Sequence, residues 1–291
     1  MTYSILGRDP AEGEIGIAVQ SKFPGVGSIV CHGRPGVGVI ATQAFASPGL
    51  GSRGLDLLEL GADAVQALGI LLKDDDRRGE RQIAILPMTG EGAAETGEAV
   101  RGWAGEALAA FGNDCIAHGN SLSNETVPRQ MVAAFERAEG DLPDRLITAL
   151  EAGEAAGGEL RGVQSAALLV VKDAGGYQGS GGVHVDISVY DHPDPIAELA
   201  RCMKLHRLSY FPSSPENLRP IDEALAAPLR ELLRGLGYRP GEGGPWSDAD
   251  IAAMERFMGT ENFDNRIRDD ALVDTEVLDE VKRRYPAQVN W

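Results

Sequence analysis

Residues 1–50 read MTYSILGRDP AEGEIGIAVQ SKFPGVGSIV CHGRPGVGVI ATQAFASPGL. This stretch determines the expected fold. Its β-branched residues and its alternation predict three strands, TYSILG, GEIGIAVQSKF and SIVCHGRPGVGVIATQAFA. The glycines between these runs predict tight turns or close backbone approaches. A helical pattern follows from Gly51 onward. Thr2 therefore stands at the very start of a buried sheet.

A threonine hydroxyl is a weak nucleophile unless a base takes its proton. A free α-amine has a pKa of about 7.7–8.0, so part of it is neutral near pH 7. If Met1 is removed, Thr2 carries its own base, which is the arrangement of hydrolases with a terminal threonine. The alternative is that Thr2 only favours β-structure in a first strand, and the residues alone leave both hypotheses open.

The chain has 291 residues, 43% of them hydrophobic and 24% charged, and a net charge of −17. This length suits one large domain, or a domain of about 200 residues followed by a small one. The acidic charge argues against nucleic-acid and anionic-membrane partners, which require basic patches. Cys31, Cys115 and Cys202 are few and widely spaced, so neither a disulfide framework nor a zinc knuckle is expected. The start of the chain resembles no signal peptide, and we expect a cytoplasmic protein.

Helices and strands alternate in groups along the rest of the first 209 residues. Two helices divided by Gly61 are expected within 51–72, with Asp63 capping the second. The further strands are expected within 82–96, 111–123, 160–173 and 181–191, the further helices within 126–155 and from Pro195, and a loop or short helix over 101–111. Such grouping favours an α+β fold of two packed, mainly antiparallel sheets with outer helices over a doubly wound parallel sheet.

A change of composition predicts a second domain. Residues 210–219 contain Pro and Ser and are typical of a linker. Residues 220–291 then predict three helices, with Ser247 and Asp274 as two of the N-caps. Their expected core consists of Leu229, Leu232, Leu233, Ile251, Met254, Phe257 and Leu278. Tyr238, Trp246 and Phe257 form either a sugar-stacking surface or part of that core, and the core is the commoner outcome.

Several strings together resemble an uncharacterised bacterial family, a domain of unknown function within the N-terminal-nucleophile (Ntn) hydrolase superfamily. They are TYSILGRDP, GEIGIAVQSKF, GVGVIATQAFASP, RGLDLL, HGN, RGVQSAALLVV and DHPDPIAEL. The resemblance implies a four-layer αββα sandwich over 1–209. In the second domain, LRELLRGLGY and WSDADIAAMERFMGTENF resemble a peptidoglycan-binding domain attached to that family.

The same resemblance implies a catalytic site. It assigns Thr2 as the nucleophile, Lys22 as a cation that stabilises the Thr2 alkoxide, Gln43 and Ala44 as the oxyanion-hole region, and Asn120 as a strand-end residue brought to the nucleophile. The further residues that it implies for substrate binding are Ser21, Ser121, Arg161, Gln164 and Ser165. For each polar residue the alternative is a structural cap or turn contact, and for Lys22 a surface lysine.

Four potential metal ligands lie close together in the sequence, at His184, Asp186, His192 and Asp194. Their spacing matches no strong metal motif, so caps and turns are the preferred explanation, and neither a metal nor a cofactor is expected. The leading hypothesis is an Ntn-type amidohydrolase that acts on a small molecule or peptide and assembles as a homo-oligomer. The alternative is a non-catalytic binding protein of the same fold that recognises a peptidoglycan-derived fragment or a peptide.

Overall fold

Thr2 is the first residue of a central strand in a six-stranded antiparallel sheet. In the computed structural model, which describes residues 2–286, β1 (Thr2–Asp9) lies between two neighbouring strands that pair with it over most of its length. The order of this sheet is β10-β9-β2-β1-β8-β7. The other strands are β2 (Glu14–Ser21), β7 (Glu106–Phe111), β8 (Cys115–Leu122), β9 (Ser165–Val171) and β10 (Val183–Val189). The register places Thr2 opposite Ser21 on one side and Asn120 on the other.

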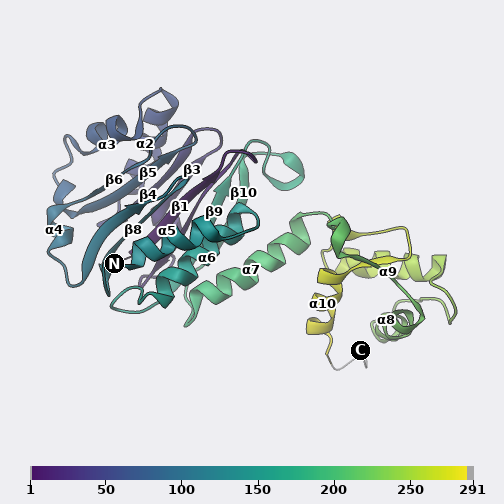
Figure 1. Ribbon diagram of the computed structural model, residues 1–291. Helices are drawn as coiled ribbons and strands as arrows, with labels where there is room; N and C mark the ends of the chain where they lie inside the picture. The colour runs from purple at the N-terminus through teal and green to yellow at the C-terminus, as the bar shows by residue number, and fades with distance from the viewer. Residues whose placement is uncertain (1, 287–291) are drawn as a thin grey trace. The chain divides into compact units, whose positions relative to one another are not determined.

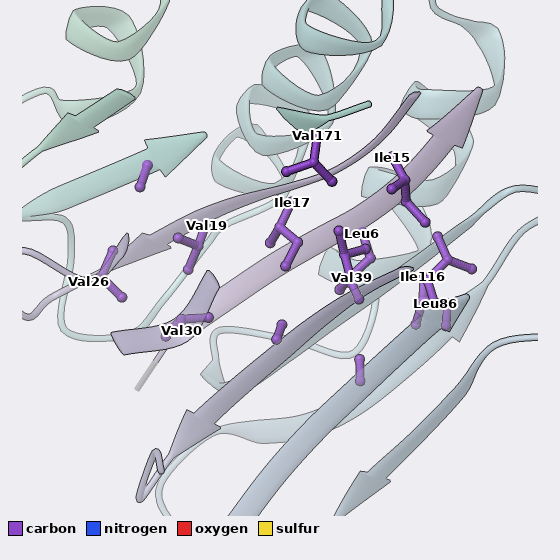
Figure 2. Packing of buried hydrophobic residues seen from close by; sticks show 13 residues of the cluster. Leu6, Ile15, Ile17, Val19, Val26, Val30, Val39, Leu86, Ile116 and Val171 are labelled. Carbon is purple, nitrogen blue, oxygen red and sulfur yellow. The ribbon is translucent and has the colours of Figure 1, made fainter. Parts of the chain in front are cut away.

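A second, four-stranded antiparallel sheet faces the first. Its strands, in the order β3-β4-β5-β6, are β3 (Cys31–Arg34), β4 (Gly38–Ala44), β5 (Arg81–Pro87) and β6 (Ala93–Thr96). Figure 2 shows the apolar cluster that fills the space between them, with Leu6, Ile17 and Ile116 from the larger sheet and Val39 and Leu86 from the smaller one. Because alternate side chains of a strand point to the same face, Thr2 and Ser4 lie on the same inner face as Leu6.

Helices cover the outer faces of both sheets (Figure 1). A second apolar cluster joins Ile40 and Ile85 to α2 (Pro48–Glu59) and α3 (Ala64–Leu72). On the larger sheet, α5 (Val127–Arg137) and α6 (Leu142–Ala155) approach so closely that a Cβ on Gly7 would lie 2.5 Å from the ring of Phe135. Asp63 and Gln66 form a capping box at the start of α3, as the sequence predicts for Asp63.

The predicted third strand is interrupted by a short helix, α1 (Gly27–Val30), and a turn, so that this part of the prediction was wrong. The helix packs directly on β9, because a Cβ added to Gly27 would lie 2.4 Å from the Cβ of Ala167. Val26 and Val30 thereby join the core between the sheets at the edge of the narrower one. The apolar pattern of residues 26–30 is the same for a buried strand and a buried helical turn, so tertiary contact decides.

The prediction of a loop or short helix over residues 101–111 was also wrong for part of that segment. The helix α4 (Glu98–Arg101) ends where that segment begins, and β7 then forms an edge strand paired with β8. The alanines of β7 have weak strand propensity, and cross-strand pairing overrides it. The expected α+β architecture with two antiparallel sheets is nevertheless confirmed.

Backbone contacts divide the chain into two units, Met1–Met203 and Lys204–Trp291. The division falls inside α7 (Pro195–Tyr210), ahead of the predicted linker, which contains a 3₁₀ turn, Pro215–Asn217, and the start of β11 (Leu218–Pro220). The C-terminal helices are α8 (Glu223–Gly235), α9 (Asp248–Thr260) and α10 (Thr275–Arg284), and β12 (Leu272–Asp274) pairs with β11. This two-stranded sheet was not predicted, since three-residue strands leave no periodic signal.

Six of the seven residues predicted for the C-terminal core belong to or pack against two neighbouring clusters, whereas Ile251 is only partly buried and belongs to neither. Leu229, Leu233 and Phe257 are fully buried in them. Tyr238 and Trp246 pack against these clusters, which favours the core over the sugar-stacking hypothesis. Over the described part of the chain, every helix is too short or too polar to span a bilayer.

Candidate functional site

The hydroxyl of Thr2 lies at one end of the space between the two sheets. Thr2 is only 5% exposed, and its Oγ1 lies 3.0 Å from Oγ of Ser21, the residue opposite it on β2. Both are β-strand residues, so the pairing of β1 with β2 fixes the contact. The side chains predicted as nucleophile and substrate contact are thus brought together.

A cavity of about 340 Å³ opens beside Thr2. Among its polar lining residues are four of those predicted from the sequence: Thr2, Ser21, Gln43 and Arg161. The backbone at the end of β4 adds Ala44, which was also predicted, together with Phe45. This volume falls within the range of small-molecule sites, roughly 300–1,000 Å³.

The apolar wall of the cavity comes from the segment between β2 and β3. Phe23, Val26, Ile29 and Val30 line it, the last two from α1. None of these four was predicted as a site residue: Phe23 was interpreted as the end of the second strand, and Ile29 and Val30 as the start of the third. The cavity therefore combines one apolar wall with polar side chains at the sheet end.

Behind Thr2 lies a chain of three buried amides that connects the two sheets. Gln43 donates from Nε2 to the Thr2 carbonyl at 3.4 Å and to Oε1 of Gln82 at 2.8 Å, and it accepts from Ser4 Oγ at 2.6 Å. Asn120 donates from Nδ2 to the same Gln82 oxygen at 2.8 Å. Gln82 Nε2 donates to Thr96 Oγ1 and to the Gly119 carbonyl. These bonds hold β1, β4, β5 and β8 in a fixed arrangement at the site.

Two non-glycine residues near Thr2 adopt positive φ, 65° at Ala44 and 51° at Ser121. Ala44 lines the cavity, and Ser121 follows Asn120 at the end of β8. Such backbone conformations cost about 1–3 kcal/mol each and concentrate at functional sites. Ser121 itself is buried, and within residues 2–286 its Oγ and the Oδ1 of Asn120 have no hydrogen-bond partner.

Glu159 joins two parts of the cavity rim and was not predicted from the sequence. Its carboxylate is fully buried and accepts from the backbone N–H of Lys22 at 3.0 Å and from Nε of Arg161 at 2.6 Å. Lys22 itself is exposed, and its Nζ donates to the Val163 carbonyl at 3.1 Å. The ammonium of Lys22 thus binds a backbone carbonyl, and Lys22 is not among the residues that line the cavity.

The remaining predicted residues support the cavity from outside its lining. Ser165 Oγ donates to the Phe23 carbonyl and accepts from the N–H of Val26 at 3.2 Å, so it holds the loop that carries the apolar wall. Gln164 Nε2 donates to Oδ1 of Asp191 at 3.1 Å. Both residues follow the segment of Arg161 and fix the start of β9.

His118 is fully buried on the inner face of β8. Its register partner on β1 is Ser4. Burial lowers the pKa of His118 to about 3, so the ring is neutral at pH 7. Both ring nitrogens lack a hydrogen-bond partner among the described residues.

The two histidines among the four potential metal ligands contact backbone groups. Nδ1 of His184 lies 3.2 Å from the Gly175 carbonyl, and His192 Nδ1 accepts from the backbone N–H of Asp194 at 3.0 Å. In the part of the chain that the structure describes, no group of three or more His, Cys, Asp or Glu side chains is positioned to bind a metal ion. The polar side chains that line the cavity beside Thr2 carry hydroxyl, amide and guanidinium groups.

Comparison with known proteins agrees with the division of the chain. The model of a "Family of unknown function (DUF1028)" matches residues 2–199, and that of a "Putative peptidoglycan binding domain" matches residues 210–280. The crystal structure of protein SPO2555 from Silicibacter pomeroyi, described as DUF1028, is similar at 30% sequence identity and a TM-score of 0.64. That match covers 71% of this chain and 86% of the other. No curated protein matches the chain.

Proposed function

Since residues 2–199 make this chain a member of DUF1028, a family of unknown function, we propose from its own site that Thr2 is the nucleophile of an Ntn-type amide hydrolase. One observation carries the proposal: the hydroxyl of Thr2 borders a ligand-sized cavity at the end of two packed sheets. The layer order of helices, sheet, sheet and helices is the one expected for that superfamily.

The proposed reaction requires Thr2 to become the first residue. Its neutral α-amine then takes the Oγ1 proton, and Oγ1 attacks the carbonyl carbon of the amide. The C–N bond breaks, the leaving amine takes up that proton, and an ester forms on Thr2. Water, deprotonated by the α-amine, attacks this ester, releases the carboxylic acid and restores the Thr2 hydroxyl.

The neighbours of Thr2 have proposed roles in this reaction. Ser21, 3.0 Å from Oγ1, orients the nucleophile, and Gln43 holds the Thr2 carbonyl. Gln43 and Ala44, both on the cavity wall, are the proposed oxyanion-hole region. Asn120 contributes through Gln82 and through its unpartnered Oδ1, which is available to a terminal amine.

The experiment begins with intact-mass measurement and N-terminal sequencing of protein from its native host. Turnover of a panel of small amides is then compared for the wild type, Thr2→Ser, Thr2→Ala and Thr126→Ala, whose exposed threonine is a matched control. We expect Thr2→Ala to lose activity by at least about a thousandfold, and Thr2→Ser and the control to retain turnover. Full activity with a residue still preceding Thr2, or in Thr2→Ala, would exclude the mechanism.

The second candidate is a binding protein that recognises a peptidoglycan-derived fragment or peptide. It is supported by the match of residues 210–280 to a peptidoglycan-binding model. Calorimetric titration of the full chain with muropeptides tests it, and the absence of heat with every fragment would remove it. The cytoplasmic location and a homo-oligomeric assembly remain proposals, which fractionation of host cells and light scattering can test.

A further inference from the structure

A second cavity, of about 350 Å³, lies beside the edge strand β10 of the larger sheet. Asp186 on β10 pairs with Leu169 on β9, whose side chain packs against the cluster between the sheets. Asp186 therefore belongs to the inner face of the sheet, and so does Ser188, two residues further along the strand. The edge strand of the smaller sheet, β3, lies over β2 and β9, so this cavity opens where the smaller sheet ends.

The short helix α1 lies between this second cavity and the one beside Thr2. Ile29 of α1 lines the Thr2 cavity, whereas Gly27 and Ser28 line the second one. Gly27 packs so tightly on β9 that a Cβ at this position would overlap a side chain of that strand. The two cavities are therefore separate sites, and an inference about the second does not depend on the function proposed for Thr2.

Asp186 is the one charged residue among the described residues that line the second cavity. Its side chain is exposed, and within residues 2–286 its carboxylate has no hydrogen-bond or ion-pair partner. Cys31 lines the cavity beside it, and burial, reinforced by the charge of Asp186, raises the pKa of the Cys31 thiol. This thiol is neutral at pH 7, so the lining has a net negative charge.

Apolar and hydroxyl groups surround this carboxylate. Leu169 and Cys31 line the cavity and are only partly buried, so they offer apolar surface to a ligand. Ser28 and Ser188 are exposed and add two hydroxyl oxygens. The hydroxyl of Ser28 donates to the Gly25 carbonyl at 3.0 Å, so its oxygen remains available as an acceptor. The lining therefore suits a ligand that donates hydrogen bonds and carries an apolar part.

The charge of the whole protein has the same sign as that of the cavity. With a net charge of −17, the protein attracts small cations and repels small anions. An ammonium group carries three N–H donors and forms charge-assisted hydrogen bonds with a carboxylate. An alkyl chain on the same ligand would cover the apolar surface, which is favourable by roughly 25 cal/mol per Å². The cavity volume also falls within the range of small-molecule sites, roughly 300–1,000 Å³.

We propose that the second cavity binds a primary alkylammonium ion, with Asp186 as its counter-ion. The hydroxyls of Ser28 and Ser188 accept its other N–H groups, and its chain lies on the apolar part of the lining. The site is distinct from the Thr2 cavity and goes beyond the proposed hydrolase activity.

Binding is tested by titration of the full-length protein at constant ionic strength, followed by NMR of the backbone amides. The probes are n-pentylammonium, its neutral analogue 1-pentanol, and methylammonium, which keeps the charge but lacks the chain. We expect n-pentylammonium to bind at least about threefold more tightly than the alcohol and about tenfold more tightly than methylammonium. Its saturable shifts should fall in α1 and β10. Equal affinity of n-pentylammonium and the alcohol, or shifts spread over the acidic surface without saturation, would overturn the proposal.

Variants at the carboxylate assign the effect. Asp186→Asn is expected to weaken binding of n-pentylammonium about threefold while leaving that of 1-pentanol unchanged, and Asp186→Glu should retain part of the preference. Glu125→Gln, at an exposed glutamate between β8 and α5, removes the same charge and is the matched control. Thr2→Ala should bind the probe like the wild type. An equal loss in Asp186→Asn and Glu125→Gln would show attraction by net charge alone and overturn the assignment.

Two sources share the proposed chemistry, a free alkylamine and the side chain of a lysine within a peptide. Nα-acetyl-L-lysine N-methylamide carries the same ammonium group together with two peptide groups, which the unpaired edge of β3 can bind. Tighter binding of this probe than of n-pentylammonium would identify a peptide lysine, and weaker binding a free amine. Either order supports an ammonium site, provided that the binding depends on Asp186.

Discussion

At the scale of single residues, His118 is the buried group whose behaviour is simplest to predict. Its pKa of about 3 in the folded protein lies below the roughly 6.5 of an unfolded histidine. Between these values the unfolded chain binds a proton that the folded chain does not, so stability falls as pH is lowered. From pH 7 to pH 5 this histidine alone should cost about 2 kcal/mol.

Replacing His118 with Leu should remove that cost. We expect the variant to be at least as stable as the wild type at pH 7, because both ring nitrogens are unpartnered within residues 2–286. Urea unfolding at pH 7 and pH 5 measures the free energy of unfolding. A drop between the two pH values that is equal in variant and wild type would contradict the assignment of the acid sensitivity to His118.

The sequence indicated part of the candidate site and missed two of the residues that support it. Thr2, Ser21, Gln43, Ala44 and Arg161 all line the cavity, as a motif at the start and ends of strands can suggest. The roles given to them remain predictions. Glu159 and Gln82 could not be recognised, because their importance depends on partners more than thirty residues away. Lys22 was assigned from its place in the sequence, which does not determine where a long flexible side chain ends.

At the scale of elements, Gln82 on β5 connects strands of both sheets through four hydrogen bonds. Gln82→Met keeps the volume but removes every polar contact, so that two buried amide donors and two acceptors each lose a partner. We expect the free energy of unfolding to fall by about 3 kcal/mol. Gln130→Met on the exposed face of α5 is the control and should change it by less than about 0.5 kcal/mol.

Urea unfolding followed by circular dichroism measures both variants. A loss in Gln82→Met no larger than in Gln130→Met would mean that the three amides contribute little to holding the sheets together. Activity on the best amide substrate, measured at urea concentrations well below the unfolding midpoint, would show whether the three hydrogen-bonded amides also fix the geometry of Thr2.

Elements with a strong periodic pattern were predicted well, and those that depend on tertiary contact were not. The strand Ser165–Val171, for example, lies within the range 160–173 in which the sequence predicts one. Neither the helix α1 nor the strand β7 was predicted, and the reasons are opposite. The short apolar run of α1 has the same pattern as a buried strand. The alanine-rich β7 has weak strand propensity and is extended because β8 pairs with it.

At the scale of the whole molecule, each of the two units has a buried polar side chain at the centre of a hydrogen-bond network, Gln82 in the first and Asp250 in the second. In the C-terminal unit, Asp250 accepts two hydrogen bonds from Arg230, at 2.8 and 2.7 Å, and others from Gly241 and Ser247. Burial alone would raise the pKa of Asp250, but these bonds hold it below its usual value. Its contribution to stability is therefore present at neutral pH and is lost as pH falls below about 4.

Asp250→Ala leaves Arg230 buried without its carboxylate partner, so we expect the C-terminal unit to lose about 3–5 kcal/mol. Hydrogen exchange followed by mass spectrometry should show faster exchange in α8 and α9. Asp248→Ala, at an exposed position of the same helix, is the control and should cost less than about 1 kcal/mol. Exchange in α8 and α9 no faster than in this control would contradict the prediction.

The inequality of the two sheets has a consequence for how this family can diversify. The four-stranded sheet is too narrow to cover the whole face of the six-stranded sheet. The four residues of α1 cover part of the remaining face next to Thr2. Ile29 and Val30 lie in α1 and take no part in strand pairing. Substitutions at these positions can therefore change the shape of the cavity beside Thr2 while every strand keeps its register. Paralogues that share the same scaffold could thus acquire new ligands through changes in one helical turn.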